Sequence, residues 1–323
     1  MEVHIQPITC PITNIVIWEP KIEENAKKFS RYLSDYEELQ ILGKGSDGVV
    51  ARCRNLLDNK VYAAKKITLG VHSLDFETIQ REVDIVSGLK HQNVVQYYTS
   101  WTDLTFAGEK SQLELEEGRN MDDGSNSSLE EGPGNTNKDK EKQQLPCLYI
   151  VQECCERTLS EELLKRGGNM TWNEASAVFT DITRGLLYIH GNNIVHGDLN
   201  PLNILVKDKN WKIGDFGIAR KQVGNCFGDE QIEEALKGRT YDAPEDKVDF
   251  KRDIFSLGMI LVELIAQPRT VAEKYDIFKS FKKDGKLPEK VSGHPLKSLA
   301  LKLLENDPAK RPSAAEVLRR ITL

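Results

Sequence analysis

The pattern of apolar and polar positions divides the chain into a first part that favours strands and a second part that favours helices. Short apolar and β-branched runs predict strands at 39–42, 49–54, 60–67, within 91–101 and at 148–152. Helical spacing predicts one helix among them, at 74–89, and then helices at 158–166, 171–190, 253–266, 272–283, 295–305 and 313–321. Either Thr171 or Asn173 caps the 171–190 helix. This order indicates an α+β protein of two lobes, with a site in the crease between them.

Two stretches do not follow these patterns. Residues from about 105 to 145 are rich in acidic residues, Gly, Ser and Asn, so burial cannot offset the entropy of ordering them. We expect a disordered acidic insert there, which is either tolerated length or a docking or phosphorylation site. Residues 1–34 form a flank that is either an edge strand or the end of a larger protein. The expected division is therefore flank 1–34, first lobe 35–153 with the insert, and second lobe 154–323.

Composition limits the classes of function. The chain has 323 residues, 39% hydrophobic and 29% charged, which is ordinary for a soluble globular protein. A net charge of −6 argues against general binding to nucleic acid or a membrane surface. No apolar run is long enough to span a bilayer, and no signal peptide is indicated. The six cysteines show no CxxC spacing, so we expect reduced thiols in a cytoplasmic protein.

A glycine-rich turn joins the first two predicted strands. It contains Gly43, Gly45 and Gly48 and is followed by Val50. A dinucleotide fingerprint must open a helix, whereas this turn links two antiparallel strands, as does a flap that lies over phosphates. By itself the glycine pattern is equally typical of a plain hairpin.

Oxygen-bearing side chains cluster in the stretch 195–205 and in the Asp-Phe-Gly run at 215–217. Asp198, Asn203 and Asp215 are expected at the mouth of one cleft, a place for Mg²⁺ and a nucleotide. Lys65 ends an apolar strand and needs a carboxylate partner to be held toward phosphate oxygens. Glu82, near the middle of the 74–89 helix, is the candidate partner, although a lone Glu on an amphipathic helix is usually only solvated.

Taken together, these motifs resemble the eukaryotic protein kinase family from about residue 36 to 323. They occur in the family order, ending with Ala-Pro-Glu at 243–245. The resemblance implies a two-lobed α+β fold, with a small mostly-β lobe that holds one key helix and a larger mostly-α lobe. It also implies a serine/threonine kinase that uses ATP and Mg²⁺. Lys65 would bind the α- and β-phosphates and pair with Glu82, Asn203 and Asp215 would hold Mg²⁺, and Asp198 would accept the proton of the substrate hydroxyl.

The same resemblance assigns further positions. Those implied to contact the nucleotide are Leu42, Gly43, Gly45, Gly48, Val50, Ala63, Lys65, Gln152, Glu153, Cys155 and Leu205. Gln152 would gate the back of the pocket, and Cys154 and Cys155 would line the hinge. Structural roles are implied for an ion pair between Glu245 and Arg311, for Asp253 bracing the catalytic loop, and for His196 packing beneath Asp-Phe-Gly.

The segments that flank the motifs are similar to the kinases of translation initiation factor 2, alpha subunit. These segments are 31–39, 55–58, 96–101 and the acidic insert, and the tail 306–314 leans to the amino-acid-starvation branch. This likeness implies repression of translation under stress and a homodimer formed through Arg31, Asp35 and Tyr97. It also implies that a helix at 273–285 docks the folded alpha subunit, although spacing alone indicates an ordinary amphipathic surface helix.

Asn200 and Gly197 depart from the family pattern. Asn200 replaces the Lys that meets the γ-phosphate, and losing one such donor lowers the rate by about 10²–10³-fold, so Asn200 is counted among the catalytic residues. Gly197 replaces the Arg that receives a phosphate from the activation segment. The segment 215–245 has no serine. We hypothesise activation without phosphorylation there, with fixed contacts from Asp229, Glu230, Glu233 and Glu234.

Two further departures concern substrate and phosphate binding. The run 238–245 is one residue shorter than the family pattern, so the threonine that supports the catalytic Asp has no clear equivalent. Asp47 lies at the tip of the glycine turn, where an aromatic residue usually covers the phosphates. These departures leave a second class open: a pseudokinase, or a weakly active nucleotide-binding scaffold. The presence of Lys65, Glu82, Asp198, Asn203 and Asp215 favours the enzyme.

Overall fold

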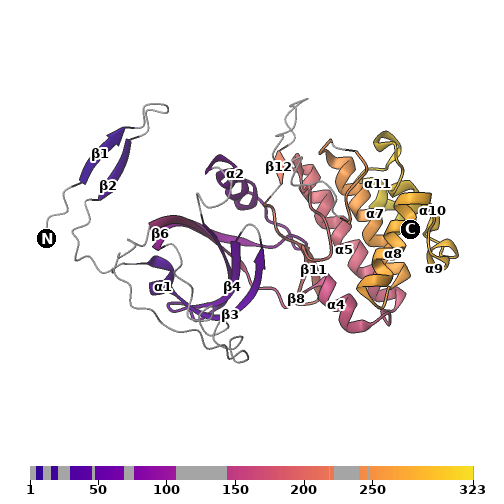
Figure 1. Cartoon of the computed structure of the whole chain (residues 1–323), viewed down its shortest axis with the longest axis horizontal. Helices are drawn as coiled ribbons and strands as arrows, with labels where there is room; N and C mark the ends of the chain where they lie inside the picture. The colour runs from indigo at the N-terminus through magenta and orange to yellow at the C-terminus, as the bar shows by residue number, and fades with distance from the viewer. Residues whose placement is uncertain are drawn as a thin grey trace, which may run out of the picture.

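The first lobe is built on a sheet of five antiparallel strands. Their order is β3-β4-β5-β7-β6, and their bounds are β3 (Tyr36–Gly45), β4 (Gly48–Asn55), β5 (Val61–Thr68), β6 (Tyr97–Phe106) and β7 (Gln144–Glu153). All the strands that the apolar pattern predicted are present, and β3, β6 and β7 extend beyond the predicted runs. Helix α2 (Phe76–Ser87), predicted at 74–89, lies beside this sheet (Figure 1).

The computed structural model describes residues 5–9, 16–20, 30–45, 48–68, 76–106, 144–217, 219–221, 240–245 and 247–322. The predictions for Asp47, for the acidic residues Asp229, Glu230, Glu233 and Glu234, and for positions 238–239 lie outside these residues. So does most of the acidic insert. At its edges, Phe106 of β6 pairs with Gln144 of β7, so the sheet reaches slightly into the stretch assigned to the insert.

Stacked aromatic rings fix the short helix α1 (Arg31–Asp35) to the sheet. Tyr32 of α1 stacks on Tyr149 of β7 with ring centroids 4.7 Å apart, and Trp101 of β6 also stacks on Tyr149, at 5.3 Å. The guanidinium of Arg31 lies 4.5 Å from the centroid of the Trp101 ring. Ser30 caps α1 by accepting the backbone N–H of Leu33. Stacked aromatic pairs of this kind contribute stability beyond that of the apolar area that they bury.

The described part of the N-terminal flank forms its own hairpin. Strands β1 (Ile5–Thr9) and β2 (Val16–Pro20) pair with each other in antiparallel register, Ile5 opposite Pro20. They form a separate two-stranded sheet and do not extend the five-stranded one. The interpretation of the flank as an edge strand of the first lobe is therefore wrong for these residues.

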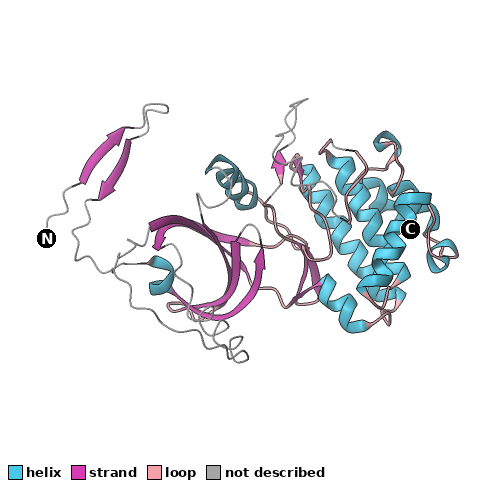
Figure 2. Cartoon of the chain, viewed as in Figure 1, coloured by secondary structure: helices cyan, strands magenta, loops and turns pink. Residues whose placement is uncertain are grey.

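Helices dominate the second lobe (Figure 2). They are α4 (Leu159–Arg166), α5 (Trp172–Gly191), α7 (Phe250–Ala266), α8 (Val271–Asp284), α9 (Glu289–Ser292), α10 (Lys297–Leu303) and α11 (Ala314–Ile321), with a 3₁₀ turn at Pro308–Lys310. The sequence predicted each helix except the short α9. Thr158, Thr171 and Ser313 form capping boxes at the starts of α4, α5 and α11, so Thr171, not Asn173, caps α5. The predicted two-lobed α+β fold is confirmed.

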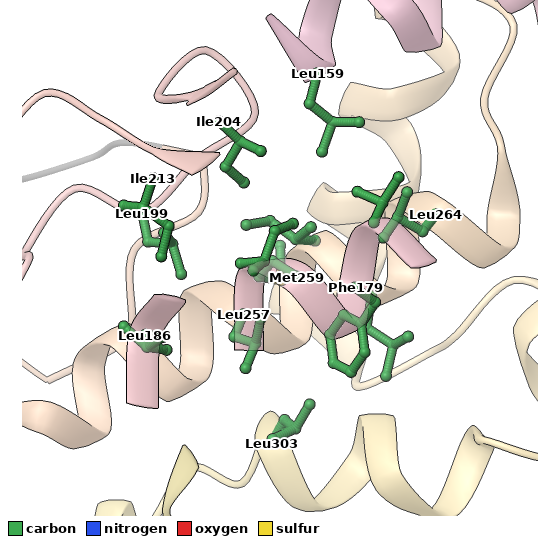
Figure 3. Packing of buried hydrophobic residues seen from close by; sticks show 14 of the residues in the cluster. Leu159, Phe179, Leu186, Leu199, Ile204, Ile213, Leu257, Met259, Leu264 and Leu303 are labelled. Carbon is green, nitrogen blue, oxygen red and sulfur yellow. The ribbon is translucent and has the colours of Figure 1, made fainter. Parts of the chain in front are cut away.

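The core of the second lobe forms around α5 and α7 (Figure 3). All residues from 252 to 266 of α7 are buried, among them Leu257, Met259 and Leu264. A fully buried apolar side chain of this size contributes about 1.5–3 kcal/mol. The same stretch also buries Arg252, Asp253 and Glu263. Because a buried charge is costly unless it is paired, these residues need partners, and their partners lie around the site.

Short strands place the site loops between the helices and the sheet. These strands are β8 (Arg157–Thr158), β9 (Ile194–Val195), β10 (Ile204–Lys207), β11 (Asn210–Ile213) and β12 (Arg220–Lys221). β10 pairs with β8 and β11, and β9 pairs with β12. The loop 196–203 therefore starts at β9 and ends at β10, and the Asp-Phe-Gly run follows β11.

Two findings within the described residues concern membrane spans and cysteines. No helix there is long and apolar enough to cross a membrane. Cys53, Cys147, Cys154 and Cys155 are free thiols, so the adjacent pair 154–155 is not bridged. Cys10 and Cys226 lie outside the described residues.

Candidate active site

Strand register brings the predicted nucleotide-binding residues of the first lobe together. Gly43 of β3 pairs with Val50 of β4, and Val50 pairs with Lys65 of β5. On the other side of β5, Ala63 pairs with Gln152 of β7. Side chains point to the same face when their residues are directly opposed on neighbouring strands or two positions apart on one strand. Val50, Ala63, Lys65 and Gln152 therefore lie on one face of the sheet.

The surroundings of the glycines in the turn differ in how much room they leave for a side chain. Gly48 has φ +134°, and a Cβ there would lie 2.0 Å from the carbonyl oxygen of Lys66, so β5 leaves room only for glycine. A Cβ at Gly43 would meet no atom of the described residues within 4 Å. Space beside Gly43 is therefore open, as a chain that approaches phosphates through its backbone requires. Gly45 ends β3, and the tip of the turn lies outside the described residues.

Lys65 links the two lobes through Asp215. Its Nζ lies 3.2 Å from Asp215 Oδ1, and the lysine is buried. Burial acts to raise the pKa of Asp215, but the charge and the hydrogen bond of Lys65 outweigh it and hold that pKa below its ordinary value. Glu82 lies on α2, but its side chain is outside what the structure describes, so its pairing with Lys65 stays a prediction.

Asp215 has a strained backbone. Its φ of 58° is in the left-handed region, which costs a residue with a Cβ about 1–2 kcal/mol. The N–H of Gly217 donates to its Oδ1 at 3.4 Å, and Phe216 next to it is buried. Strain of this kind is maintained only where the surroundings hold it, and it concentrates at functional sites.

Asn203 and Asp198 contact each other directly. Asn203 Nδ2 donates to the carbonyl oxygen of Asp198 at 2.8 Å and to its carboxylate Oδ2 at 3.1 Å. The amide nitrogen is thereby used, which leaves Oδ1 of Asn203 as its atom for a cation. The N–H of Gly214 donates to the carbonyl of Asn203 at 2.8 Å, so this loop is joined to the residue before Asp215.

Asn200 is turned into the loop itself. Its Nδ2 donates to the carbonyl of Asp198 at 3.1 Å, and its Oδ1 accepts the N–H of Leu202 at 2.9 Å. The bond to Oδ1 closes an Asx turn, and the bond from Nδ2 ties the amide to the backbone of Asp198. In the structure this amide therefore braces the loop. Its counting among the catalytic residues stays a prediction.

Asp253 of α7 holds the start of the loop. Its carboxylate accepts the N–H of His196 at 2.9 Å and that of Gly197 at 2.8 Å. Although burial acts to raise the pKa of Asp253, hydrogen bonds and charge, first of all from His190, hold that pKa below its ordinary value. Gly197 has φ +82°, which favours glycine. The predicted bracing contact of Asp253 is present.

His196 packs beneath Asp-Phe-Gly, as the resemblance implied. Its Nδ1 accepts the N–H of Asp198 at 3.3 Å, so Nε2 carries the proton and donates to the carbonyl of Gly214 at 3.0 Å. The imidazole meets the ring of Phe216 edge-on, with centroids 5.1 Å apart. The fully buried ring thus joins the loop to the Asp-Phe-Gly run.

The predicted hinge is held by Glu153. Its buried carboxylate accepts the N–H of Gln96 at 2.6 Å and lies 2.9 Å from Lys212 Nζ of β11. Cys155 is half-buried, and burial raises the pKa of its thiol to about 12. Of the flanking apolar residues, Leu42 of β3 is exposed and Leu205 of β10 is half-buried.

Residues 240–245 are anchored by ion pairs, of which the sequence predicted one. Arg311 makes two contacts with Glu245, at 2.5 and 2.8 Å, which is the predicted buried pair. The sequence reasoning missed the pair of Asp242 with Arg252, at 3.2 Å. A signal was present, since Arg252 is a charge beside Asp253 at the start of a mostly apolar helix.

The positions implied for partners lie on the surface. Arg31 and Asp35 form an ion pair with each other within α1, at 3.3 Å, and both side chains are about half exposed. Tyr97 is half-buried, and its hydroxyl is 2.9 Å from Ser100 Oγ. On α8, Tyr275 is exposed whereas Phe278 is buried.

The donor set fits a nucleotide-bound Mg²⁺ better than a metal held by protein alone. Among the described residues, no group of three or more His, Cys, Asp or Glu side chains could hold a metal ion. Mg²⁺ commonly takes one or two carboxylates and completes its shell with phosphate oxygens and water. Asp215 and the Asn203 amide oxygen provide such a partial set, and the open space beside Gly43 suits phosphates.

Comparison with known families agrees with this geometry. The family model described as the protein kinase domain matches residues 36–321, and the chain belongs to this family.

Individual relatives show which protein kinases the chain is similar to. The chain is 35% identical to eIF-2-alpha kinase GCN2 of Arabidopsis thaliana over 94% of this chain and 26% of that protein. It is 31% identical to the interferon-induced, double-stranded RNA-activated protein kinase of Rattus norvegicus, over 90% of this chain and 52% of the relative. The resemblance drawn from the flanking segments is thereby confirmed. The chain spans between a quarter and about half the length of these relatives.

Proposed function

We propose that this chain is an ATP- and Mg²⁺-dependent serine/threonine kinase that phosphorylates the alpha subunit of translation initiation factor 2 and so represses translation under stress. The substrate is suggested by the name of the Arabidopsis relative at 35% identity. The observation that carries the catalytic part is the convergence of Lys65, Asp215, Asn203 and Asp198, with Lys65 3.2 Å from Asp215 and Asn203 3.1 Å from Asp198.

Each of these side chains has a distinct task in the proposal. Lys65 binds the α- and β-phosphates, and Glu82 of α2 is its proposed second partner. Asp215 and Asn203 hold Mg²⁺, which when bound neutralises charge on the phosphate oxygens. Asp198 orients the substrate hydroxyl and accepts its proton, and the bond from Asn203 fixes its carboxylate. The adenine is enclosed by the apolar side chains of Leu42, Val50, Ala63 and Leu205, with Gln152 behind and the backbone of Glu153–Cys155 at the edge.

Partner binding is proposed for two surfaces. The exposed face of α8, which carries Tyr275, docks the folded alpha subunit. A second copy of the chain binds through Arg31, Asp35 and Tyr97, where the half-exposed ion pair within α1 can exchange partners. The protein acts in the cytoplasm, where its substrate takes part in translation.

The test is transfer of radiolabelled phosphate from Mg·ATP to the purified alpha subunit. Wild-type chain is expected to transfer phosphate, and Asp198→Asn to be slower by about 10²–10⁴-fold, because the proton acceptor is lost. Equal rates in the two proteins would contradict the role of Asp198. No transfer by either protein, together with clear ATP binding, would favour a nucleotide-binding scaffold.

Docking on α8 needs a separate measurement. Tyr275→Asp is expected to raise KM for the folded alpha subunit and to leave KM for a short peptide around its phosphorylated residue unchanged. The matched control is Lys302→Asp on α10, another exposed position of the second lobe. Equal changes of KM for subunit and peptide would contradict docking on this helix.

A further inference from the structure

Residues 240–245, which we call the anchor segment, carry buried groups that the proposed phosphoryl transfer does not use. Asp242 is only 9% exposed and faces Arg252 of α7, which is 3% exposed. Arg252 Nη2 lies 3.2 Å from Asp242 Oδ1, and its Nη1 donates to the carbonyl of Glu245 at 3.0 Å. One guanidinium thus holds the anchor segment at two points.

A buried ion pair is weak evidence for stability, because desolvation offsets most of its attraction. Arg252 illustrates this cost, since its buried Nε has no hydrogen-bond partner among the described residues. What such a pair supplies is a defined geometry, because each charge is tolerated only where the other lies. The Asp242–Arg252 pair therefore specifies where the anchor segment sits on α7.

Asp253, the next residue on α7 after Arg252, holds the loop that leads to Asp198. Asp253 accepts the N–H groups of His196 and Gly197, at 2.9 and 2.8 Å, directly before Asp198. Consecutive residues of one buried helix therefore hold the loop of the proposed proton acceptor and the anchor segment. The distance between these two parts of the site is set by a rigid element.

Tyr241 ties the anchor segment to the same helix a second time. Its hydroxyl donates to the carboxylate of Glu263, and Ser256 Oγ donates to its carbonyl oxygen at 2.9 Å. Glu263 in turn lies 3.4 Å from Lys274 Nζ of α8. The buried carboxylate of α7 therefore joins the anchor segment to α8.

The face of α8 that meets the anchor segment is opposite in character to its exposed face. Phe278 meets the Tyr241 ring edge-on, with centroids 5.3 Å apart. Burial lowers the pKa of Lys282, and the charge of Asp242 acts to raise it. Lys274, Phe278 and Lys282 are four residues apart and so lie on one face of the helix. Tyr275 stays exposed.

We propose that Asp242 and Arg252 are positioning residues for the protein substrate: their ion pair locks the anchor segment to α7 and α8, so that a protein docked on α8 presents its hydroxyl to Asp198 without a phosphate on the anchor segment. This inference rests on the proposed function. It goes beyond it by assigning substrate placement to a buried charge pair outside the phosphate-binding residues.

Steady-state kinetics with the alpha subunit test the proposal. Asp242→Asn and Arg252→Gln are expected to raise KM for the subunit by about tenfold or more and to leave KM for ATP within about twofold. Glu162→Gln is the matched control, because Glu162 is equally buried and lies 2.5 Å from Arg157 and 2.6 Å from Arg166, away from the anchor segment. An unchanged KM for the subunit in folded Asp242→Asn would overturn the proposal.

Hydrogen exchange of the full chain gives a measurement that does not depend on activity. Asp242→Asn should speed exchange at 240–245 and on α8, whereas Glu162→Gln should not. Should the single variants fail to fold, Asp242→Val with Arg252→Leu removes both charges together, which is often neutral for stability. The double variant is expected to show the same faster exchange. If its exchange rates and its KM for the subunit equal those of the wild type, the proposal is overturned.

Two further arms separate the possible failures. Phosphatase treatment of the wild type should leave its KM for the subunit and its hydrogen-exchange rates unchanged. A higher KM or faster exchange after treatment would show that the anchor segment depends on a phosphate. A wild type that transfers no phosphate at all would contradict the proposed function. The exchange measurement would then still decide whether Asp242 and Arg252 lock the anchor segment.

Discussion

The side-chain amide of Asn200 donates a hydrogen bond to the carbonyl oxygen of Asp198, at 3.1 Å. Asn203 donates to the same oxygen at 2.8 Å, so two amides from the following turn hold the backbone of the proposed proton acceptor. The position that looked in the sequence like a lost positive charge therefore has a structural use. A lysine could not make this turn, because it has no acceptor for the N–H of Leu202.

The first prediction concerns the balance of these effects at Asn200. Asn200→Lys is expected to raise kcat by up to about 10²–10³-fold, because it brings charge toward the transferred phosphoryl group. It should also lower the free energy of unfolding by about 1 kcal/mol, because the turn is lost. Asn200→Ala is the control: it loses the turn and gains no charge, so stability falls and kcat does not rise. An alanine variant as fast as the lysine variant would show that charge is not what limits the rate.

The strands and helices could be predicted from the sequence because they depend on local periodicity, and the candidate site residues could be named because they stand in motifs. Lys65, Asp198, Asn203 and Asp215 belong to this group. The turn of Asn200 could not be predicted, since an amide is equally able to bond a phosphate or its own backbone.

Contacts between distant segments were the harder part. The pair of Asp242 with Arg252 needs the packing of residues 240–245 on α7, which no period in the sequence encodes. Arg252 could only be noticed as a charge without a purpose. The pair of Glu245 with Arg311 was found through the family resemblance and not through the pattern of the chain.

The second prediction compares two glycines of the same turn. Gly48→Ala is expected to lower the free energy of unfolding by about 1–3 kcal/mol, since its Cβ would lie 2.0 Å from the Lys66 carbonyl oxygen. Gly43→Ala should leave stability nearly unchanged, because its Cβ meets nothing within 4 Å in the part of the chain that the structure describes, but should raise KM for ATP if phosphates approach there. Urea unfolding and ATP kinetics check both. Equal stability losses in the two variants would contradict the steric argument.

The third prediction is that the hinge thiols are poor nucleophiles. Burial raises the pKa of Cys155 to about 12 and also raises the pKa of Cys154. At pH 7.5 a thiol of pKa about 12 has about a thousandth of the thiolate of an ordinary cysteine, so iodoacetamide should label Cys155 about a thousandfold more slowly. Mass spectrometry of native and urea-unfolded protein measures this ratio, with Cys154→Ala and Cys155→Ala separating the sites. Fast native labelling of Cys155 that Mg·ATP blocks would instead show an activated thiol in the pocket.

The fourth prediction is a pH dependence of stability that comes from Asp253. Because its folded-state pKa is lowered, the stability that its carboxylate contributes is present above the unfolded-state pKa, about 3.9, and is lost as the pH falls through the folded value. Asp253→Asn should therefore cost about 3–5 kcal/mol at pH 7, and the difference from wild type should shrink below about pH 4. Urea unfolding over this pH range measures the difference in the free energy of unfolding.

Glu37→Gln, which changes an exposed partner of Arg54, is the control for the Asp253 variant, with an expected effect below about 1 kcal/mol. A difference that stays constant with pH would contradict the role of the ionised carboxylate.

The fifth prediction separates regulation from structure in the anchor segment. Thr240 is exposed, and the segment 215–245 has no serine, so Thr240→Ala is expected to keep transfer within about twofold and stability within about 0.5 kcal/mol. Tyr241→Phe should behave differently, because it removes a hydrogen bond to the buried Glu263 and leaves Lys274 as the remaining described partner of that carboxylate. A loss of about 1–3 kcal/mol is expected, with a higher KM for the alpha subunit. Kinetics and urea unfolding of both variants make the comparison. A Thr240→Ala variant of normal stability that transfers no phosphate would show that a phosphate on Thr240 is required, and the hypothesis of activation without it would be wrong.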